Sequence, residues 1–453
     1  MTEHIAAQHA FFQTGATRSI AFRKKQLKQL KKMLRENEDR LYEAIYADFK
    51  KSRFETYTSE VALLEQDIDD ALKNVSTWAA NKCVSTNLAN FPGKSYIQPE
   101  PFGVSLVIGA WNYPYLLSLG PVIPAIAAGN TVVLKPSELP DHTAQLMKSL
   151  VSSYFDPEFF TVVTGGVETS TELLKQPFQK IFFTGSPKVG KIVYQAAAKQ
   201  LIPVTLELGG KSPAFVTKHA NIKRTVQRLV WGKFLNAGQT CIAPDYVWVE
   251  ASIANKFLQA LKAQILKMNY AFENDNYMQI INTDHVDRLV GYLEDATVFF
   301  GGDHNRDHRF ISPTILTDVT FESRCMQEEI FGPILPVLFY ENLAEAIAKT
   351  KQLPKPLSCY VFSDNQKEQH QITETLSFGG GAINDTIMHI SNPKLPFGGV
   401  GQSGIGSYHG EAGFKTFSHY KSMLKKANWI ELPLKYPPYT ARKLRWIKRL
   451  LSW

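Results

Sequence analysis

The stretch Lys180-Ile-Phe-Phe-Thr-Gly-Ser-Pro-Lys-Val-Gly190 leads from an apolar run into a helix start within a few residues. The run Lys180–Phe183 has the composition of a buried strand, and the chain can turn at Gly185. Ser186 is a preferred residue type before the first turn of a helix, and Pro187 suits the first helical position. The stretch therefore predicts a strand, a tight turn and a helix, which is the repeating unit of a parallel sheet with helical crossovers.

The same alternation continues on both sides of this stretch. Apolar runs that predict strands lie at Val104–Gly109, Thr131–Leu134, Phe160–Val163, Lys180–Phe183 and Val204–Glu207. Helical patterns separate these runs near residues 114–128, 141–154, 168–175 and 187–199. Such an alternation is typical of a Rossmann-like sheet, in which parallel strands are covered by helices.

A second alternation follows the first. Strands are predicted near residues 212–217, 245–250, 309–316, 333–340, 357–362 and 380–384, and helices near 221–235, 252–268, 284–295, 342–350 and 365–377. Amphipathic helical patterns over residues 17–50 and 53–80 precede both sheets. The predicted fold class is therefore α/β, with two Rossmann-like parallel-sheet domains and a small oligomerisation extension.

The composition is that of a globular protein. The 453 residues include 20% charged and 44% hydrophobic side chains, which suits two or three domains. The four cysteines form no CxxC pair and the histidines form no HExxH motif, so we expect a reducing compartment and no metal site. Prolines and asparagines interrupt the apolar region 104–134, and no secretory signal is apparent. We therefore expect a cytoplasmic protein without a membrane span.

The net charge of +8 is a property of the C-terminal segment. After Glu431 the chain holds six basic residues and no acid, and without these six the net charge is +2. The six are Lys435, Arg442, Lys443, Arg445, Lys448 and Arg449. The basic character is thus no sign of a nucleic-acid-binding fold.

The last residues, Ala441–Trp453, have helical spacing. Four apolar residues fall on one side of this helix and three arginines on the other, namely Leu444, Ile447, Leu450 and Leu451 against Arg442, Arg445 and Arg449. Trp446 and Trp453 suit a membrane interface. We predict weak peripheral contact with anionic membranes, which would leave the protein cytoplasmic or associated with a membrane surface. The alternative is a helix that packs on its own subunit or on a partner.

Cys241 is the candidate nucleophile. It lies in Asn236-Ala-Gly-Gln-Thr-Cys-Ile-Ala-Pro244, between an amphipathic run and an alternating strand. A cysteine at such a turn can be exposed for attack, although most intracellular cysteines are small buried hydrophobes. The candidate base is Glu207 in Leu206-Glu-Leu-Gly-Gly-Lys-Ser-Pro213, at the end of a predicted strand. A nucleophile and a base that are distant in sequence are usual in a folded active site.

Three further stretches carry candidate binding groups, and each has a plain structural alternative. The predicted helix N-terminus at Gly185–Gly190 can seat a pyrophosphate, or it is an ordinary strand-to-helix turn. Lys135 and Glu138 follow a predicted strand where such sheets bind cofactors, or they belong to a solvated turn. Asn112 can donate its amide to an oxyanion, or it is a buried asparagine with structural partners.

The stretch Gly399-Val-Gly-Gln-Ser-Gly404 matches GxGxxG but lacks the context of a dinucleotide-binding fingerprint. That fingerprint needs a strand before it, a helix after it and an acid about 20 residues further on. Here Pro396 and Phe397 precede the glycines. We interpret the stretch as a Gly-rich loop that lines a site. The run Glu328-Glu-Ile-Phe-Gly-Pro333, which precedes an apolar strand, indicates little by itself.

Taken together, these stretches resemble the aldehyde dehydrogenase superfamily in order, spacing and wording. The shared motifs are WNYP, KPSE, FTGS-x-x-VG, LELGGKSP, GQTC and EEIFGP, and the similarity runs from about residue 17 to residue 425. The stretches Pro396–Gly404 and Ser407–Gly410 are most similar to the class 3 branch, which includes fatty and aromatic aldehyde dehydrogenases. Members of this branch are typically homodimers that use NAD, and some also use NADP.

The resemblance implies roles for individual residues. Cys241 matches the family nucleophile, Glu207 the general base and Asn112 the oxyanion donor. Cofactor-binding roles fall on Lys135, Glu138, Gly185, Ser186, Gly190, Leu208, Glu329 and Phe331. Of these, Lys135 and Glu138 match positions that hold the adenosine ribose. Glu329 and Phe331 match positions that steady the nicotinamide ribose and ring.

The resemblance also implies a reaction and a division into domains. The reaction is NAD(P)-dependent oxidation of an apolar aldehyde, medium- or long-chain or aromatic, to the carboxylic acid. The cofactor-binding domain comprises residues 1–82 and 100–206, the catalytic domain 207–384, the bridging or oligomerisation segments 83–99 and 385–425, and the basic amphipathic tail 426–453. An aromatic-lined tunnel for the aldehyde is expected at Tyr113, Tyr115, Trp231 and Phe397.

Two alternatives to this reaction stay open. One is an acylating enzyme, in which coenzyme A rather than water takes the acyl group; the presence of Glu207 favours hydrolysis, because water needs a base and a thiolate does not. The other is a catalytically silent member of the fold that serves as a binding or structural unit.

Overall fold

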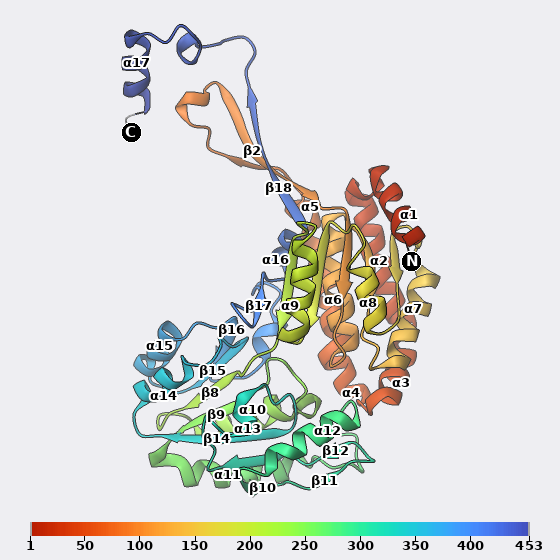
Figure 1. Ribbon diagram of the computed structural model, residues 1–453, viewed down its shortest axis with the longest axis vertical. Coiled ribbons are helices and arrows are strands. Elements are labelled where there is room, and N and C mark those ends of the chain that lie inside the picture. Colours follow the sequence, from red (N-terminus) through yellow and green to blue (C-terminus); the bar gives the residue numbers. More distant parts are fainter. Residues whose placement is uncertain (1, 452–453) are drawn as a thin grey trace.

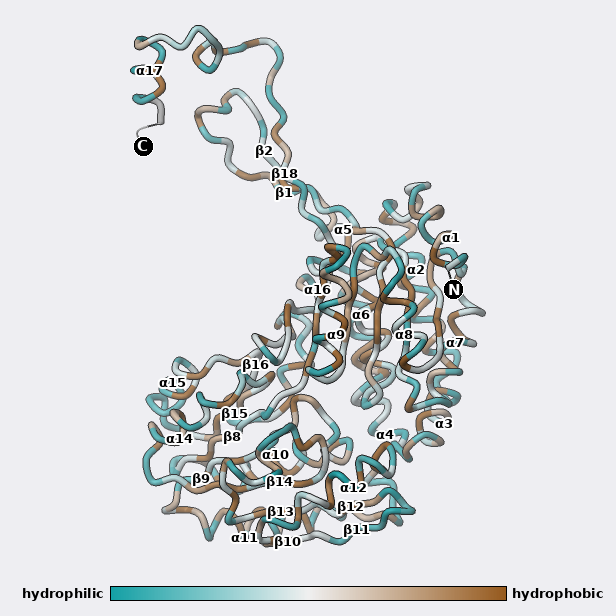
Figure 2. Tube along the Cα trace, in the orientation of Figure 1, coloured by the Kyte–Doolittle hydropathy of each residue, from teal (hydrophilic) through white to brown (hydrophobic). Residues whose placement is uncertain are grey.

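Two mainly parallel sheets, one above the other in Figure 1, and a projecting arm make up the computed structural model, which describes residues 2–451. The apolar residues concentrate in the strands and in the helices that cover them, as the brown segments of the chain trace in Figure 2 show. Apolar strands of this kind, buried on both faces, are the usual consequence of helices packing on each side of a parallel sheet.

The first sheet has six strands in the order β17-β7-β6-β3-β4-β5. They are β17 (Gly404–Ile405), β7 (Val204–Leu208), β6 (Lys180–Gly185), β3 (Val104–Ile108), β4 (Thr131–Lys135) and β5 (Phe160–Val162). All neighbours are parallel except β17, which runs antiparallel to β7. The five strands predicted for this sheet are therefore present, and β17 adds an edge strand from the Gly-rich loop.

Nine helices accompany the first sheet in the described part of the chain. The crossovers are α6 (Pro114–Ala128), α7 (Asp141–Tyr154), α8 (Val167–Leu173) and α9 (Pro187–Ala198). The N-terminal helices are α1 (Thr2–Gln13), α2 (Ile20–Glu36), α3 (Glu38–Phe49), α4 (Arg53–Thr56) and α5 (Ala62–Trp78). Every residue of α6 is buried. This helix is apolar all round because α2, α5 and the sheet enclose it.

The second sheet has seven strands in the order β10-β13-β14-β9-β8-β15-β16. They are β10 (Thr297–Phe300), β13 (Thr314–Thr317), β14 (Ile334–Tyr340), β9 (Tyr246–Glu250), β8 (Pro213–Val216), β15 (Ser358–Phe362) and β16 (Gly380–Ile383). Only β10 is antiparallel to its neighbour. The accompanying helices are α10 (Ile222–Phe234), α11 (Ala254–Met268), α12 (Thr283–Val290), α13 (Arg324–Gln327), α14 (Leu343–Thr350) and α15 (Gln366–Thr375). The predicted α/β class with two parallel-sheet layers is confirmed.

One predicted strand is wrong. The run 309–316 forms two strands, β12 (Phe310–Ile311) and β13, rather than one. Pro313 stands between them and has no N–H for a ladder hydrogen bond. β12 instead pairs antiparallel with β11 (His304–Asn305) in a small hairpin.

The arm is a three-stranded antiparallel sheet that projects from the body (Figure 1). It consists of β1 (Lys82–Val84), β2 (Gly93–Pro101) and β18 (Ser418–Lys426), and β18 follows α16 (Gly410–Thr416). The chain then runs to α17 (Ala441–Leu451), which contacts the turn Leu88–Asn90 of the arm. The predicted C-terminal helix is present, while the side chains of Leu450 and Leu451 and the whole of Trp453 lie outside the described residues.

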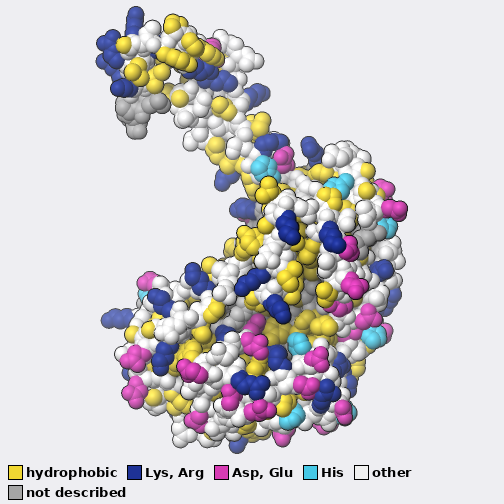
Figure 3. Space-filling model, viewed as in Figure 1, with side chains coloured by type: hydrophobic (Ala, Val, Ile, Leu, Met, Phe, Trp, Pro, Cys, Tyr) yellow, Lys and Arg dark blue, Asp and Glu magenta, His cyan; other side chains and the backbone are white. Residues whose placement is uncertain are grey.

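The arm and its tail expose large apolar side chains beside basic ones (Figure 3). The exposed apolar side chains are Val84, Leu88, Phe91, Tyr420, Met423, Leu424, Trp429, Ile430, Leu432, Tyr436, Tyr439, Leu444 and Trp446. Within residues 2–451, none of the helices has both the length and the apolar character that crossing a bilayer requires. The same residues contain no cluster of three or more His, Cys, Asp or Glu side chains arranged to hold a metal ion.

Candidate active site

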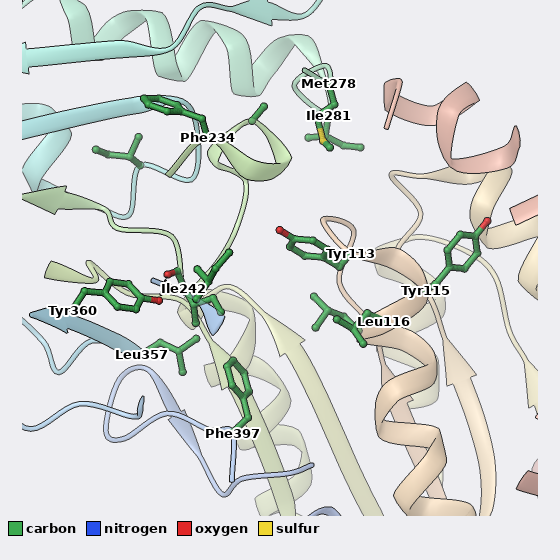
Figure 4. Packing of buried hydrophobic residues seen from close by; sticks show 14 of the residues in the cluster. Tyr113, Tyr115, Leu116, Phe234, Ile242, Met278, Ile281, Leu357, Tyr360 and Phe397 are labelled. Carbon is green, nitrogen blue, oxygen red and sulfur yellow. Dashed lines mark hydrogen bonds between the residues drawn. The ribbon is translucent and has the colours of Figure 1, made fainter. Parts of the chain in front are cut away.

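A cavity of about 1030 Å³ lies between the two halves of the body, and Cys241 is on its wall. Its lining is mostly apolar and comes from the N-terminal helices over residues 42–63, from the start of α6, from α10, and from segments near residues 240, 268–276, 387–391 and 397. Figure 4 shows Tyr113, the residue before α6, and Leu116 of α6 on one side and Ile242 and Phe397 on the other. A concave apolar site with a few polar groups is what a small organic ligand needs.

The loop that carries Cys241 has an unusual backbone. Asn236, Ala237 and Gly238 all have positive φ, at 56°, 51° and 73°, a conformation that only glycine adopts without cost. Gly238 is required here, because a Cβ at this position would lie 2.2 Å from the carbonyl oxygen of Gly332. The left-handed run reverses the chain at the end of α10 and presents the Cys241 side chain to the cavity. Such strain is common where a reactive group is held in place.

The electrostatic surroundings of Cys241 hold its thiol in the protonated form. Burial raises the pKa of Cys241, and the carboxyl groups of Glu329 and Glu207 raise it further, against the backbone N–H groups of Cys241 and Ile242. Two carboxyl groups are therefore close enough to Cys241 to act on its charge, although they come from distant parts of the sequence. A positive charge near the thiol would reverse this effect.

Glu207 is the penultimate residue of the buried strand β7, and its carboxyl group receives no hydrogen bond from the described residues. It is 3% exposed, and neither carboxyl oxygen accepts a hydrogen bond from any group in the described part of the chain. Burial alone raises its pKa well above the usual range. Burial of an acid without hydrogen-bond partners lowers the stability of the fold. Glu207 is therefore a candidate for a group that accepts and donates protons in a reaction.

The Gly-rich loop around residue 401 supports the strand of Glu207. Gly404 of β17 pairs with Glu207, and the N–H of Leu208 donates to the carbonyl of Ser403 at 3.1 Å. A Cβ at Gly404 would lie 2.5 Å from the carbonyl oxygen of Leu206. The glycines of the loop thus permit close approach to β7.

Asn112 follows β3 and is tied to the loop of Cys241. Its Nδ2 donates to the carbonyl of Gln239 at 3.0 Å, and Asn236 Nδ2 donates back to the carbonyl of Asn112 at 2.9 Å. Asn112 is 3% exposed. The amide group has a second N–H, which is available for another acceptor. Nucleophile, carboxyl and amide are thus brought to one region from three separate stretches.

The predicted ribose and pyrophosphate residues lie at the carboxyl ends of β4 and β6, the two strands that flank β3 in the first sheet. Lys135 ends β4 and donates to Glu138 at 2.6 Å. Gly185 ends β6, and Ser186 caps α9 by accepting a hydrogen bond from the N–H of Val189. This edge of a parallel sheet, with free N–H groups at a helix start, is where nucleotides bind.

Gly190 and Leu208 form a packing pair. A Cβ at position 190 would lie 2.6 Å from Leu208 Cδ2, so only glycine lets the first turns of α9 approach β7 this closely. The close approach brings the N-terminus of α9 next to the strand that carries Glu207. The residues at this edge therefore fit a dinucleotide. In turns that bind dinucleotides, the third glycine likewise allows the helix to pack closely on the strand.

Glu329 and Phe331 lie in the loop between α13 and β14, against the same region. A Cβ at Gly209 would lie 1.8 Å from Glu329 Oε2, so the Glu329 side chain rests on the chain just after Glu207. Burial, with help from Asp245, raises the pKa of Glu329 to about 8. The Phe331 ring packs edge-on against Trp111, with 5.3 Å between ring centroids. Phe331 is therefore next to the residue that precedes Asn112.

A buried ion pair that the sequence did not suggest holds this loop. Lys211 Nζ pairs with Asp245 and also donates to the carbonyls of Cys325 at 2.8 Å and Glu328 at 2.9 Å. Asp245 accepts in addition from the N–H of Ile330 at 3.0 Å. Both residues belong to stretches singled out by sequence, but nothing local indicates that they meet. They position Glu329 and Phe331.

Three of the four predicted tunnel residues line the cavity. Tyr113, Trp231 and Phe397 do so, and the hydroxyl group of Tyr113 lies 2.6 Å from that of Thr240, next to Cys241. Tyr115 does not, and its prediction is wrong. It is fully buried on another side of α6, where its hydroxyl donates to the carbonyl of Leu41 at 2.9 Å (Figure 4). Residues two apart at the start of a helix face different directions.

The sequence of this chain matches a known protein family. The model of the aldehyde dehydrogenase family matches residues 2–423. A 4,4'-diaponeurosporen-aldehyde dehydrogenase of Staphylococcus aureus is 48% identical over 97% of this chain and 96% of its own. Aldehyde dehydrogenase family 3 member A2 of Pongo abelii is 45% identical over 97% of this chain and 92% of its own.

The fold is also similar to that of a solved structure. The substrate-bound state of AldH from Staphylococcus aureus superposes with a TM-score of 0.96 at 46% identity, over 99% of this chain and 98% of the other.

Proposed function

Since the chain belongs to the aldehyde dehydrogenase family, in its class 3-like branch, we propose that it oxidises an apolar aldehyde to the carboxylic acid with NAD or NADP as hydride acceptor. The observation that carries the proposal is a pair of groups in one place. A thiol on the wall of a large apolar cavity, Cys241, lies within electrostatic reach of a buried carboxyl without partners, Glu207. The relatives' names refer to aldehydes as substrates.

In the first step Cys241 attacks the aldehyde carbon. Burial and the two carboxyl groups raise the pKa of the Cys241 thiol, so the thiol must lose its proton before or during attack. A cationic group beside the thiol would favour loss of that proton to solvent before the attack. Attack gives a thiohemiacetal whose oxygen carries the developing charge. The second N–H of the Asn112 amide is the donor for that oxygen, together with the backbone N–H of Cys241.

The bound cofactor would supply the hydride acceptor and a cationic ring. The residues that fit it are Glu329 and Phe331 for the nicotinamide half, Lys135 and Glu138 for the adenosine ribose, and the N-terminus of α9 for the pyrophosphate. Glu138 repels a 2′-phosphate and Lys135 attracts one, and the two form a pair at 2.6 Å. This pair therefore sets the preference between NAD and NADP.

In the last step Glu207 takes the proton of the water that hydrolyses the Cys241 thioester. A carboxyl whose pKa is raised by burial accepts a proton more readily than an ordinary carboxylate does. This role separates hydrolysis from acyl transfer to coenzyme A, which needs no base for the incoming thiolate. Assays with and without coenzyme A distinguish the two reactions.

The test of this proposal is a single-turnover experiment. Glu207→Gln should form about one equivalent of NADH per Cys241 and then stall, because the thioester forms but is not hydrolysed. Stopped-flow absorbance measures the burst, and mass spectrometry of the quenched protein shows the acyl group on Cys241. Normal turnover by this variant would contradict the role of Glu207. A silent protein would give no burst in the unchanged chain.

We also propose that the arm mediates a homodimer. Its strand β18 is an edge strand with a nine-residue ladder on one side only, and an exposed edge with apolar neighbours invites pairing with another sheet. Sedimentation velocity should give a dimer. Proline at Ser422 and proline at Met423 remove N–H groups that point to opposite edges of β18, so a comparison of the two variants shows whether the free edge pairs with the partner. A monomer at micromolar concentration would exclude the proposal.

A further inference from the structure

Glu55 is an acidic residue inside the apolar cavity. Four side chains with full charges line the cavity: Glu43, Arg53, Glu55 and Asp275. Three of them are exposed to solvent, whereas Glu55 is partly buried. Arg53, the only base, is turned to Asp39 at 2.8 Å. The cavity therefore has a single interior charge site, and its sign is negative.

The Glu55 carboxyl is also in contact with the loop of the nucleophile. It accepts a hydrogen bond from the backbone N–H of Asn236 at 2.7 Å. Asn236 is the first of the three left-handed residues that lead to Cys241. Glu55 and Cys241 are thus on the wall of the same cavity and are joined through one short loop.

The nearest cation does not form a hydrogen bond with Glu55. Lys51 is fully buried and donates to Glu60 at 2.7 Å, while its Nζ lies 4.1 Å from the centre of the Tyr113 ring. The other oxygen of Glu60 accepts from the N–H groups of Tyr115 at 2.8 Å and Leu116 at 3.2 Å, at the start of α6. Lys51 and Glu60 therefore compensate each other, and Glu55 adds the net negative charge.

The negative charge of Glu55 matters because the substrate and the product of the reaction differ in charge. An aldehyde is neutral, whereas the carboxylic acid product is an anion at neutral pH. Both bind in the same apolar cavity, so most of their contacts are the same. Two like charges in a cavity of low dielectric constant repel each other much more strongly than in water. A carboxylate on the cavity wall therefore distinguishes product from substrate without touching the aldehyde group.

We propose that Glu55 is a specificity-determining residue that disfavours anions in the substrate cavity, so that the carboxylate product leaves readily and aldehydes that carry a second carboxylate are poor substrates. This inference rests on the proposed function and deepens it. It assigns to Glu55 no part in the bond-making steps.

The proposal makes the discrimination depend on pH. Burial raises the pKa of Glu55, and Glu60 raises it further, while Lys51 and the N–H of Asn236 lower it. The tyrosines that face Glu55 are Tyr113, Tyr270 and Tyr277, and each has a raised pKa. They stay neutral when Glu55 loses its proton. Repulsion of anions should therefore increase as pH rises through the pKa of Glu55.

The test uses Glu55→Gln, which keeps an oxygen for the N–H of Asn236 and removes the charge. Titration calorimetry measures the binding of decanoate, a simple anion with an apolar chain, at a series of pH values. We expect the variant to bind decanoate about tenfold more tightly than the unchanged chain at the upper end of the series. We expect no such gain at the lower end, where Glu55 is neutral. Asp275→Asn, at the exposed rim, is the matched control and should change binding little.

Calorimetry needs no turnover, so a failure here is distinguishable from a failure of the proposed reaction. Equal affinities of Glu55→Gln and the unchanged chain at every pH would overturn the inference. So would an equal gain in Asp275→Asn. A large loss of decanal oxidation by Glu55→Gln without any gain in decanoate affinity would show that Glu55 only holds the Asn236 loop, and would overturn the inference.

A second measurement needs no variant. In the unchanged chain, kcat/KM for an aldehyde with a terminal carboxylate is compared with that for a neutral aldehyde of the same length. The ratio should fall several-fold as pH rises, because only the first substrate meets the charge of Glu55. A ratio that is constant over the same range would contradict the inference.

Discussion

The cavity at Cys241 and the projecting arm leave opposite kinds of chemical group without partners. In the cavity region, which includes the buried groups that act electrostatically on Cys241 and Glu329, the groups are polar and buried: both oxygens of Glu207 and the amine of Lys233 have no hydrogen-bond partner in the described part of the chain. On the arm and its tail the groups are apolar and exposed, and Trp429 and Tyr439 of the tail are 78% and 80% exposed. Folded proteins usually give buried polar groups hydrogen-bond partners and bury large apolar side chains. The cavity region departs from the first of these tendencies, and the arm with its tail departs from the second.

The difference indicates what each region binds. A buried polar group without a partner is costly, and a small polar molecule can supply the missing hydrogen bond or proton. An exposed apolar group is costly only when many lie together, and what covers them is another surface. We therefore expect changes in the cavity region to alter catalysis, and changes in the arm to alter association with little effect on chemistry.

The largest effect should come from Cys241→Ala. Without the thiol no covalent adduct forms, so NADH production should fall to background in a spectrophotometric assay with decanal. Cys83→Ser is the matched control, because Cys83 is an exposed thiol on the arm. It should keep full activity. If Cys83→Ser lost activity as well, the separation of the two regions would be wrong.

Asn112→Ala should have the next largest effect. Loss of one oxyanion donor typically costs about 10²–10³ in rate. The change also removes the hydrogen bond to Gln239, so thermal unfolding must be measured alongside kcat. A fall in kcat with little change in Tm supports the donor role. A large fall in Tm together with unchanged kcat would show that Asn112 only holds the loop.

Deletion of residues 428–453 should change membrane binding rather than chemistry. The tail carries Lys435 and the basic residues of α17 next to exposed Trp429 and Trp446, a combination that binds anionic interfaces weakly. Co-sedimentation with phosphatidylserine liposomes should fall several-fold, and kcat for a water-soluble aldehyde should stay within about twofold. Equal co-sedimentation of the two proteins would exclude the membrane role. A decrease that also occurs with neutral liposomes would exclude the charge argument.

The smallest effect expected is a gain of stability in Lys233→Met. Lys233 is fully buried, and burial lowers its pKa from the usual 10.5 to about 8. Because the folded state disfavours the charged amine, the penalty is complete below about pH 8, declines as pH rises toward 10.5 and is absent above it. The variant should therefore be more stable by about 1–3 kcal/mol at pH 7. Urea unfolding at pH 7 and at the highest pH that the fold tolerates measures the difference.

Lys233 also connects the stability of the cavity region with binding of the cofactor. Its amine is one of the groups that lower the pKa of Glu329, so Lys233→Met should raise that pKa and weaken binding of NAD. A variant that is more stable and binds NAD less well would show that the cavity region gives up stability for function. A variant that is no more stable at pH 7 would contradict the assignment of an unpaired buried amine.

Local sequence was sufficient for the two sheets and for most of the residues at the site. The turn at Gly185–Pro187 needs only the preferences of glycine, serine and proline. The alternation of apolar runs and helical patterns places Glu207, Lys135 and Gly185 at strand ends in advance. Since the carboxyl ends of parallel strands lie at one edge of a sheet, these three residues are expected at the same edge.

Tertiary contacts decided what local sequence left open. Tyr113 and Tyr115 are equally aromatic in sequence, yet the direction in which α6 starts sends one to the cavity and the other to Leu41. Glu55 looks like a surface acid in a helical pattern, and only its contact with Asn236, 181 positions away, places it at the cavity. The pairing of Lys211 with Asp245 is of the same kind.

The amino-acid sequence by itself thus determined the α/β architecture and which side chains have reactive chemistry, because strand, turn and helix preferences act over a few neighbouring residues. The tertiary structure alone decided which of these side chains are buried, which lack partners and which share a cavity. Burial and pairing depend on groups brought together from distant positions, and these are the factors that shift the pKa of Glu207, Cys241 and Lys233.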